Sequence, residues 1–150
     1  MKLKRLYPDQ PIVGVGAVLV LEGKILLEKR KNQPGKGKWS IPGGIVDLGE
    51  HLEDAVIRET LEETCLEVEK PRLLDVVENV ELDDKGKVKY HFVIVDYALR
   101  TKSSDFRVSS DADELRWVPF SEVEEFDLTE SFRVFFRRNR QTLEKASYCP

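Results

Sequence analysis

The sequence predicts a single α+β domain with a mixed β-sheet and few helices, on the basis of three observations. Its 150 residues suit one domain, and no shift in composition divides them. Hydrophobic residues make up 41% and charged residues 35%, a balance too apolar for disorder and too charged for a membrane protein. β-rich segments occur mostly as pairs joined by short turns, and helical segments follow each group of strands, in the order β-β-β-α-β-β-β-α.

The first half of the chain predicts a hairpin, a short strand and a helix. Residues Ile12 to Leu21 are rich in β-branched residues, and Ile25 to Leu27 continue as a second strand after a glycine turn. A polar loop with Pro and two glycines, 31–38, separates this hairpin from the apolar segment Trp39 to Ile41. Residues Leu52 to Thr64 lack Gly and Pro and carry acidic residues in the first turn, which predicts a helix.

The second half predicts another hairpin, a short strand and a final helix. The hairpin pairs Leu73 to Leu82 with Val88 to Leu99. A short strand at Leu115 to Val118 follows a polar loop. Ser121 is a candidate cap for a helical turn through Phe126, and Thr129 is a candidate cap for a helix ending near Lys145.

Charge and composition restrict the possible partners. The 24 basic and 28 acidic residues give a net charge of −4, which disfavours nucleic acid as a partner. The longest apolar stretch has half of the roughly 20 residues that a membrane span needs, and no signal-peptide run follows the N-terminus, so we expect a cytoplasmic protein. Two cysteines and two histidines argue against a disulfide framework or a zinc site. A bound metal would therefore be one that prefers oxygen ligands.

The most informative segment is the acidic end of the first helix. Glu59, Glu62 and Glu63 share one helix face, in line with the apolar Ala55 and Val56 of the preceding turn. We expect this stripe to point into the protein or a cleft, where a divalent cation would relieve the repulsion among the carboxylates. The alternative is an ordinary solvated face.

The spacing of these acids resembles the signature of the Nudix hydrolase family. A glycine, Gly44, is followed by Glu50 and Arg58-Glu59, and Glu62-Glu63 and Leu66 complete the box over residues 44–66. The resemblance implies a Nudix fold, a mixed β-sheet sandwiched between α-helices, with residues 1–150 as one Nudix hydrolase domain similar to short ADP-ribose pyrophosphatase and MutT-like members.

Two positions depart from the Nudix signature. Thr60 replaces an aliphatic residue, and its β-branched side chain still suits packing against the sheet. Cys65 replaces the glycine that ends the helix. A left-handed cap at that position costs a residue with a Cβ about 1 kcal/mol.

The resemblance also implies an activity. It is the Mg²⁺-dependent hydrolysis, with Mn²⁺ as a possible substitute, of a nucleoside diphosphate linked to another moiety, by attack of water at phosphorus. The substrate would be a small nucleotide of the ADP-ribose or (d)NTP type. The matched metal ligands are the Gly43 carbonyl and three carboxylates, those of Glu59, Glu62 and Glu63.

The remaining roles follow from the same match. Arg58 would orient a carboxylate, and Glu62 or Glu63 would act as the base, helped by acids of the loop that follows the second hairpin. Gly44, Asp111 and Glu114 are candidates for substrate binding. The alternative function is a non-catalytic Nudix-fold module that senses a nucleotide. Both a monomer and a homodimer remain open.

Overall fold

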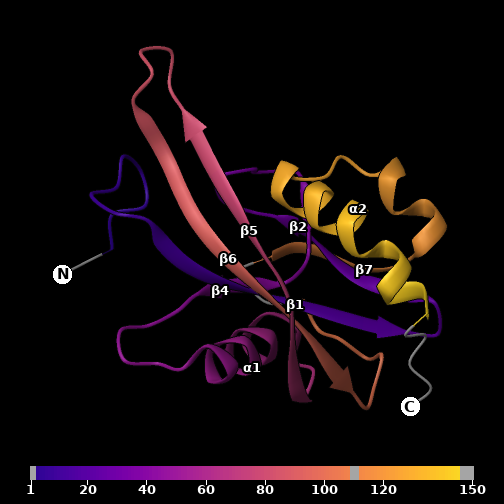
Figure 1. Ribbon diagram of the computed structural model, residues 1–150. Coiled ribbons are helices and arrows are strands. Elements are labelled where there is room, and N and C mark those ends of the chain that lie inside the picture. The colour runs from indigo at the N-terminus through magenta and orange to yellow at the C-terminus, as the bar shows by residue number, and fades with distance from the viewer. Residues whose placement is uncertain (1–2, 109–111, 146–150) are drawn as a thin grey trace.

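The protein is built on a mixed β-sheet with one helix packed on each side, as the computed structural model of residues 3–108 and 112–145 shows (Figure 1). Its elements, in chain order, are β1 (Ile12–Leu21), β2 (Lys24–Arg30), β3 (Trp39–Ser40), β4 (Gly43–Ile45), α1 (Leu52–Thr64), β5 (Val68–Leu82), β6 (Val88–Thr101), β7 (Ala112–Pro119), the 3₁₀ helix η1 (Phe120–Glu125) and α2 (Glu130–Lys145). None of the helices in these described ranges is long and apolar enough to cross a membrane.

The strand order explains why the sheet is mixed. Strands β3-β2-β1-β6-β5 lie side by side, β4 pairs with β1, and β7 pairs with β2. Strands β1 and β6 run parallel, from Ile12 opposite Phe92 to Leu19 opposite Leu99. The other pairings between strands are antiparallel, so the predicted α+β class with a mixed sheet is confirmed.

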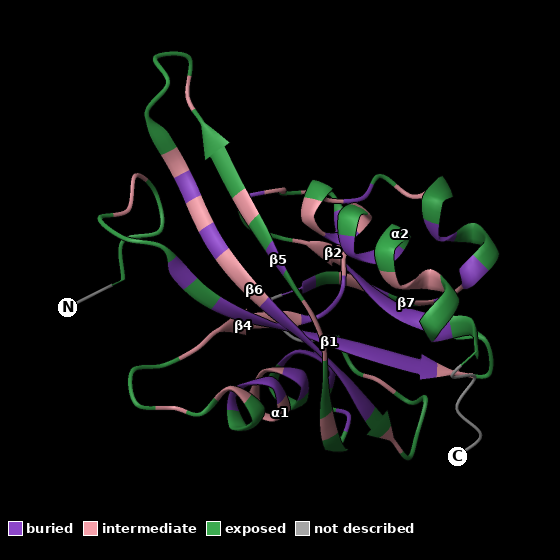
Figure 2. Ribbon diagram, viewed as in Figure 1, coloured by how far each residue is buried: buried purple, intermediate pink, exposed green. Residues whose placement is uncertain are grey.

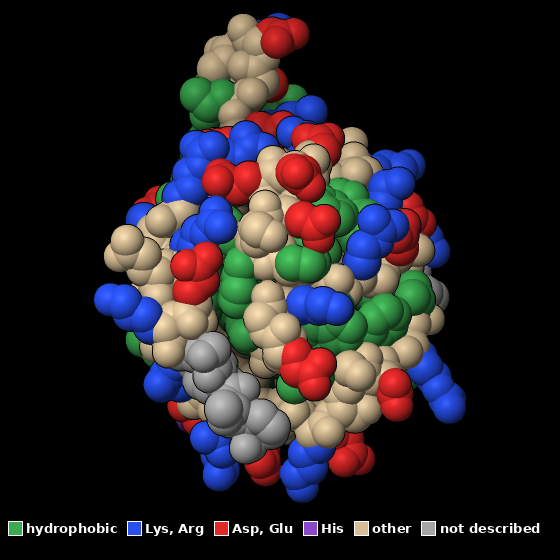
Figure 3. All heavy atoms as spheres, turned by 90° about the vertical axis from the view of Figure 1, so that its right-hand side faces the viewer, with side chains coloured by type: hydrophobic (Ala, Val, Ile, Leu, Met, Phe, Trp, Pro, Cys, Tyr) green, Lys and Arg blue, Asp and Glu red, His purple; other side chains and the backbone are tan. Residues whose placement is uncertain are grey.

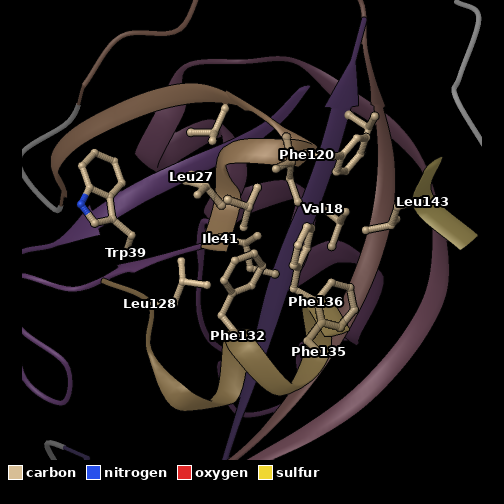
Figure 4. Close-up of a cluster of buried hydrophobic side chains, with 14 of the residues drawn as sticks. Val18, Leu27, Trp39, Ile41, Phe120, Leu128, Phe132, Phe135, Phe136 and Leu143 are labelled. Carbon is tan, nitrogen blue, oxygen red and sulfur yellow. The ribbon is translucent and has the colours of Figure 1, made fainter. Parts of the chain in front are cut away.

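Strand β1 is buried on both faces because a helix covers each of them (Figure 2). Alternate side chains of a strand point to opposite sides, so β1 contributes to two cores. Val15 and Leu19 pack with Val56 of α1. On the other face, Val18 lies in a larger cluster whose aromatic side chains come largely from α2 (Figure 4). These two cores hold α1 and α2 on opposite sides of the same strand.

Most predicted elements are confirmed, and the differences lie in irregular strands. Strand β1 and helix α1 have the predicted bounds. Residues Gly43–Ile45, for which no strand was predicted, form the strand β4, which pairs with β1. Strand β5 begins at Val68, five residues before the predicted start. Its register shifts between Glu69 and Arg72, around Pro71, which lacks the N–H that a regular ladder needs.

The C-terminal half shows the predicted helices with one change of type. The segment predicted as a helical turn forms η1, and β7 begins at Ala112, earlier than predicted. Thr129 caps α2: its hydroxyl accepts a hydrogen bond from the Phe132 N–H at 3.4 Å. On the side of the molecule viewed in Figure 3, hydrophobic side chains gather near the middle of the face, with acidic and basic side chains among and around them.

Candidate active site

The three acidic residues of α1 differ in how far they are buried. Glu63 is only 7% exposed, and the Glu59 side chain is 15% exposed. The Glu62 side chain is 52% exposed, because it lies about 100° around the helix from Glu63 and faces solvent. The predicted inward orientation therefore holds for Glu59 and Glu63 but not for Glu62.

The two glycines of β4 bring the backbone close to these carboxylates. Gly43 pairs with β1 so closely that a Cβ on it would lie 2.1 Å from the Val15 carbonyl oxygen. A Cβ on Gly44 would lie 2.2 Å from the carboxyl carbon of Glu59. The Gly43 N–H donates a hydrogen bond to Glu63 Oε2 at 3.3 Å. Glycine is thus required at position 43 for the close pairing of β4 with β1, and at position 44 any side chain would displace the Glu59 carboxylate from its place beside β4.

Arg58 links the acids to one another. Its guanidinium donates two hydrogen bonds to Glu50, from Nε at 2.7 Å and from Nη2 at 2.9 Å. Nη1 donates to Glu59 at 2.9 Å and to Glu62 at 3.2 Å, and Nη2 also reaches the Ile45 carbonyl. The hydrogen bond from Arg58 lowers the pKa of Glu50 to about 2, and the same bond raises the pKa of Arg58. Arg58 thus contacts three acids of the box, and its bond to Glu62 is an i,i+4 ion pair on the helix surface. Its role in orienting a carboxylate stays a prediction.

The structure adds one acidic residue that the sequence analysis missed. Glu28, in β2, is 5% exposed and shares a side-chain hydrogen bond with Glu63. Burial raises the pKa of Glu63 well above its ordinary range, and the hydrogen bond and charge of Glu28 raise it further. A carboxylate directly after the buried run Ile25 to Leu27 is the sequence signal that would have identified it.

The structure describes one of the two later acids that were predicted to bind substrate. Asp111 lies outside the described residues. Glu114 lies in β7 opposite Lys29 and forms an ion pair with Arg116, whose guanidinium lies 5.2 Å from the centre of the Trp39 ring. The predicted roles of Asp111 and Glu114 in substrate binding remain predictions.

The oxygen donors suit a hard cation in chemistry, although they do not converge in this arrangement. Across residues 3–108 and 112–145, no three His, Cys, Asp or Glu side chains are placed to hold an ion. The physical reason is that Arg58 engages Glu59 and Glu62, while Glu63 turns toward Gly43 and Glu28. Carboxylates beside a backbone carbonyl are nevertheless the ligands that Mg²⁺ prefers. Because Gly44 has no Cβ, the Glu59 carboxylate can lie directly against the backbone of β4.

Comparison with known sequences identifies the family. Residues 10–138 match the NUDIX domain. The chain is 35% identical to an ADP-ribose pyrophosphatase of Methanocaldococcus jannaschii over 136 residues, which cover 91% of this chain and 73% of that protein. It is 34% identical to a MutT-like protein of Streptomyces ambofaciens over 121 residues, 79% of this chain and 70% of that protein.

Solved structures agree with the sequence match. A MutT NUDIX hydrolase from Burkholderia pseudomallei superimposes with a TM-score of 0.73 at 36% identity, covering 86% of this chain and 98% of that one. The NUDIX domain of Shewanella oneidensis NrtR, solved with ADP ribose, gives a TM-score of 0.75 at 26% identity and covers 90% of each chain. With the family domain matched over most of its length and with this fold, the chain belongs to the NUDIX family and is a Nudix hydrolase.

Proposed function

We propose that this Nudix hydrolase is a Mg²⁺-dependent pyrophosphohydrolase that cleaves a nucleoside diphosphate linked to another moiety, with ADP-ribose as the first candidate. The observation that carries the proposal is the meeting of the box acids Glu59 and Glu63 with the two glycines of β4. The choice of substrate is supported by the ADP-ribose pyrophosphatase of M. jannaschii and by the S. oneidensis domain solved with ADP ribose. The MutT-like relatives keep (d)NTPs as the second candidate class.

The residues that would hold the metal are three acids of the box and the glycine directly before it. They are the carbonyl of Gly43 and the carboxylates of Glu59, Glu62 and Glu63. A bound Mg²⁺, or Mn²⁺ in its place, supplies charge neutralisation at the diphosphate and lowers the pKa of a bound water. Arg58 bonds one oxygen of Glu59 and one oxygen of Glu62. A carboxylate has two oxygens, so each of these two could bind the cation through one oxygen while the other stays bonded to Arg58.

The chain's own groups account for positioning and proton transfer. Arg58, held at two points by Glu50, is a positioning residue that limits the rotation of Glu59 and Glu62. In the hydrolysis, the water oxygen bonds to phosphorus, the bond from phosphorus to the bridging oxygen breaks, and a carboxylate accepts the proton of the water. Glu62 and Glu63 are the candidate acceptors, and the half-exposed Glu62 can return the proton directly to solvent.

A substrate screen tests the proposal. ADP-ribose, NADH, dinucleoside polyphosphates and (d)NTPs are each incubated with the protein and Mg²⁺, and the products are separated by chromatography. We expect ADP-ribose to yield AMP and ribose 5-phosphate. Hydrolysis of none of these compounds would contradict the proposal, and tight binding of ADP-ribose without turnover would favour the nucleotide-sensing alternative.

The variant Glu63→Gln links the activity to the box. Glutamine keeps the size of the side chain and removes its charge, so we expect turnover to fall by at least about 10²-fold, to the level of the Mg²⁺-free reaction. The matched control is Glu81→Gln, because Glu81 is exposed near the tip of the β5–β6 hairpin and loses the same charge. Unchanged turnover in Glu63→Gln would refute the assigned role of the box.

A further inference from the structure

Glu28 lies on the side of β2 that faces α1. Successive side chains of a strand alternate, so Glu28 points to the same side as Leu26. Leu26 is fully buried in the core that contains Ala55 and Val56 of α1. Two residues after Leu26, the side chain of Glu28 meets Glu63 of α1, and the two carboxyl groups share a hydrogen bond.

This contact is unfavourable for the fold on its own. Glu28 is 5% exposed and Glu63 is 7% exposed, so two acidic groups touch where little water reaches them. Two ionised carboxylates would repel each other there and lose their hydration, so without a cation the hydrogen bond between Glu28 and Glu63 needs a proton on one of them. An apolar residue at position 28 would simply continue the packing of Leu26. A buried acidic residue where packing favours an apolar one is found mainly at functional sites.

The surroundings of the pair indicate which ligand would offset the repulsion. The Gly43 N–H bonds to Glu63, and Gly44 contacts Glu59, so the buried pair adjoins the group of donors assigned to the cation. The charge of Glu59 also acts on Glu63. A divalent cation bound between Glu63 and a further carboxylate would replace repulsion with two attractions.

We propose that Glu28 is an additional ligand of the divalent cation, binding it through its carboxylate together with Glu63. The inference rests on the proposed function, since it concerns the same metal site. The competing explanation is that Glu28 serves only as a hydrogen-bond partner that orients Glu63. The two explanations differ for Glu28→Gln, because glutamine keeps a hydrogen bond to Glu63 but is a much weaker metal ligand.

The test measures metal binding without nucleotide. Free Mn²⁺ is followed by electron paramagnetic resonance during titration of the parent protein, Glu28→Gln and the control Glu81→Gln. We expect Mn²⁺ to bind at least about 10-fold more weakly to Glu28→Gln and with parental affinity to the control. The rise in melting temperature that Mn²⁺ produces in the parent should also shrink in Glu28→Gln. Parental Mn²⁺ affinity in Glu28→Gln would overturn the proposal.

A second variant guards against failure of the first to fold. Glu28→Leu matches the apolar neighbours of position 28, so without metal it should melt at or above the temperature of the parent, and it should bind Mn²⁺ as weakly as Glu28→Gln or more so. Failure of both variants to fold would overturn the proposal, because Glu28 would then serve the fold.

The same titration separates this inference from the proposed function. A parent protein that neither binds Mn²⁺ nor hydrolyses any nucleotide refutes both. If the parent binds Mn²⁺, and Glu63→Gln loses that binding while Glu28→Gln keeps it, the box function stands and only the role of Glu28 is refuted.

Discussion

The two helices pack on opposite faces of β1, yet they bury different kinds of residue. Helix α2 buries the aromatic side chains of Phe132, Phe135 and Phe136 (Figure 4). Helix α1 buries Ala55 and Val56 in its first half and then carries polar groups inward over its last two turns. The same sheet is therefore covered by an ordinary amphipathic helix on one side and by a helix that breaks the apolar pattern on the other.

The buried polar residues of α1 differ in whether the helix itself satisfies their hydrogen bonds. The buried hydroxyl of Thr60 donates to the Val56 carbonyl at 2.6 Å, and that of Thr64 donates to the Thr60 carbonyl at 2.7 Å. Both alcohols are satisfied within the helix, as buried polar groups must be. Glu63 instead meets a second carboxyl group, that of Glu28. Among the buried polar residues of α1, Glu63 is therefore the one whose burial serves function and not the helix itself.

The largest effect should come from the apolar helix. Phe135 is fully buried between α2 and the sheet, so Phe135→Ala should lower the free energy of unfolding by about 3–5 kcal/mol through lost burial and a cavity. Urea denaturation followed by circular dichroism measures this change. Val134→Ala, on the exposed side of the same helix, should change it by less than about 1 kcal/mol. Equal losses in the two variants would contradict the contrast drawn between the faces of α2.

Much of the fold was predictable because its elements follow local rules. Strand β1, with its β-branched residues, and helix α1, with its unbroken run of helix-forming residues, have the predicted bounds. Thr129 caps α2 as predicted. The start of β5 was not predictable, since Pro71 and the register shifts around it hide the strand from any alternation pattern. Strand β4 escaped prediction because two glycines pair with β1 only through tertiary contact.

The candidate site was predictable only where it is local in sequence. The fixed spacing of Glu59, Glu62 and Glu63 on one helix pointed to the box. The contact of Glu28 with Glu63 joins residues 35 positions apart, and only the packing of β2 against α1 reveals it. Pairing across strands likewise places Asp96 of β6 beside Gly16, a contact with no signature in the sequence.

Asp96 is the exception on the face that α2 covers, and it predicts a pH dependence. It is 1% exposed, and its Oδ1 has no hydrogen-bond partner among the described residues. Burial, reinforced by the charge of Asp75 and opposed by Arg138, raises the pKa of Asp96 to about 8. The folded state thus keeps a proton that the unfolded chain releases near pH 4, so this contribution to stability is complete below pH 4 and is lost as the pH rises through 8.

The variant Asp96→Asn isolates this contribution, because asparagine carries no ionisable proton. Relative to the parent, Asp96→Asn should gain a few kcal/mol of unfolding free energy between pH 4 and pH 8. Urea denaturation of both proteins at each pH measures the difference, and the other titrating groups cancel in it. A difference that stays constant over this range would contradict a protonated Asp96 in the folded protein.

The smallest effect concerns the end of α1, where the strain of the acidic helix can be measured directly. Cys65 adopts the left-handed conformation expected for the box glycine, with φ 61° and ψ 15°, and its N–H donates to the Leu61 carbonyl at 2.9 Å. Cys65→Gly removes the clash of the Cβ, and the greater freedom of glycine in the unfolded chain offsets part of the gain, so we expect stabilisation of about 0.5–1 kcal/mol. Cys65→Ala keeps the Cβ and should give no gain in the same urea titration. If alanine stabilises the protein as much as glycine does, the strain lies in the thiol and not in the backbone.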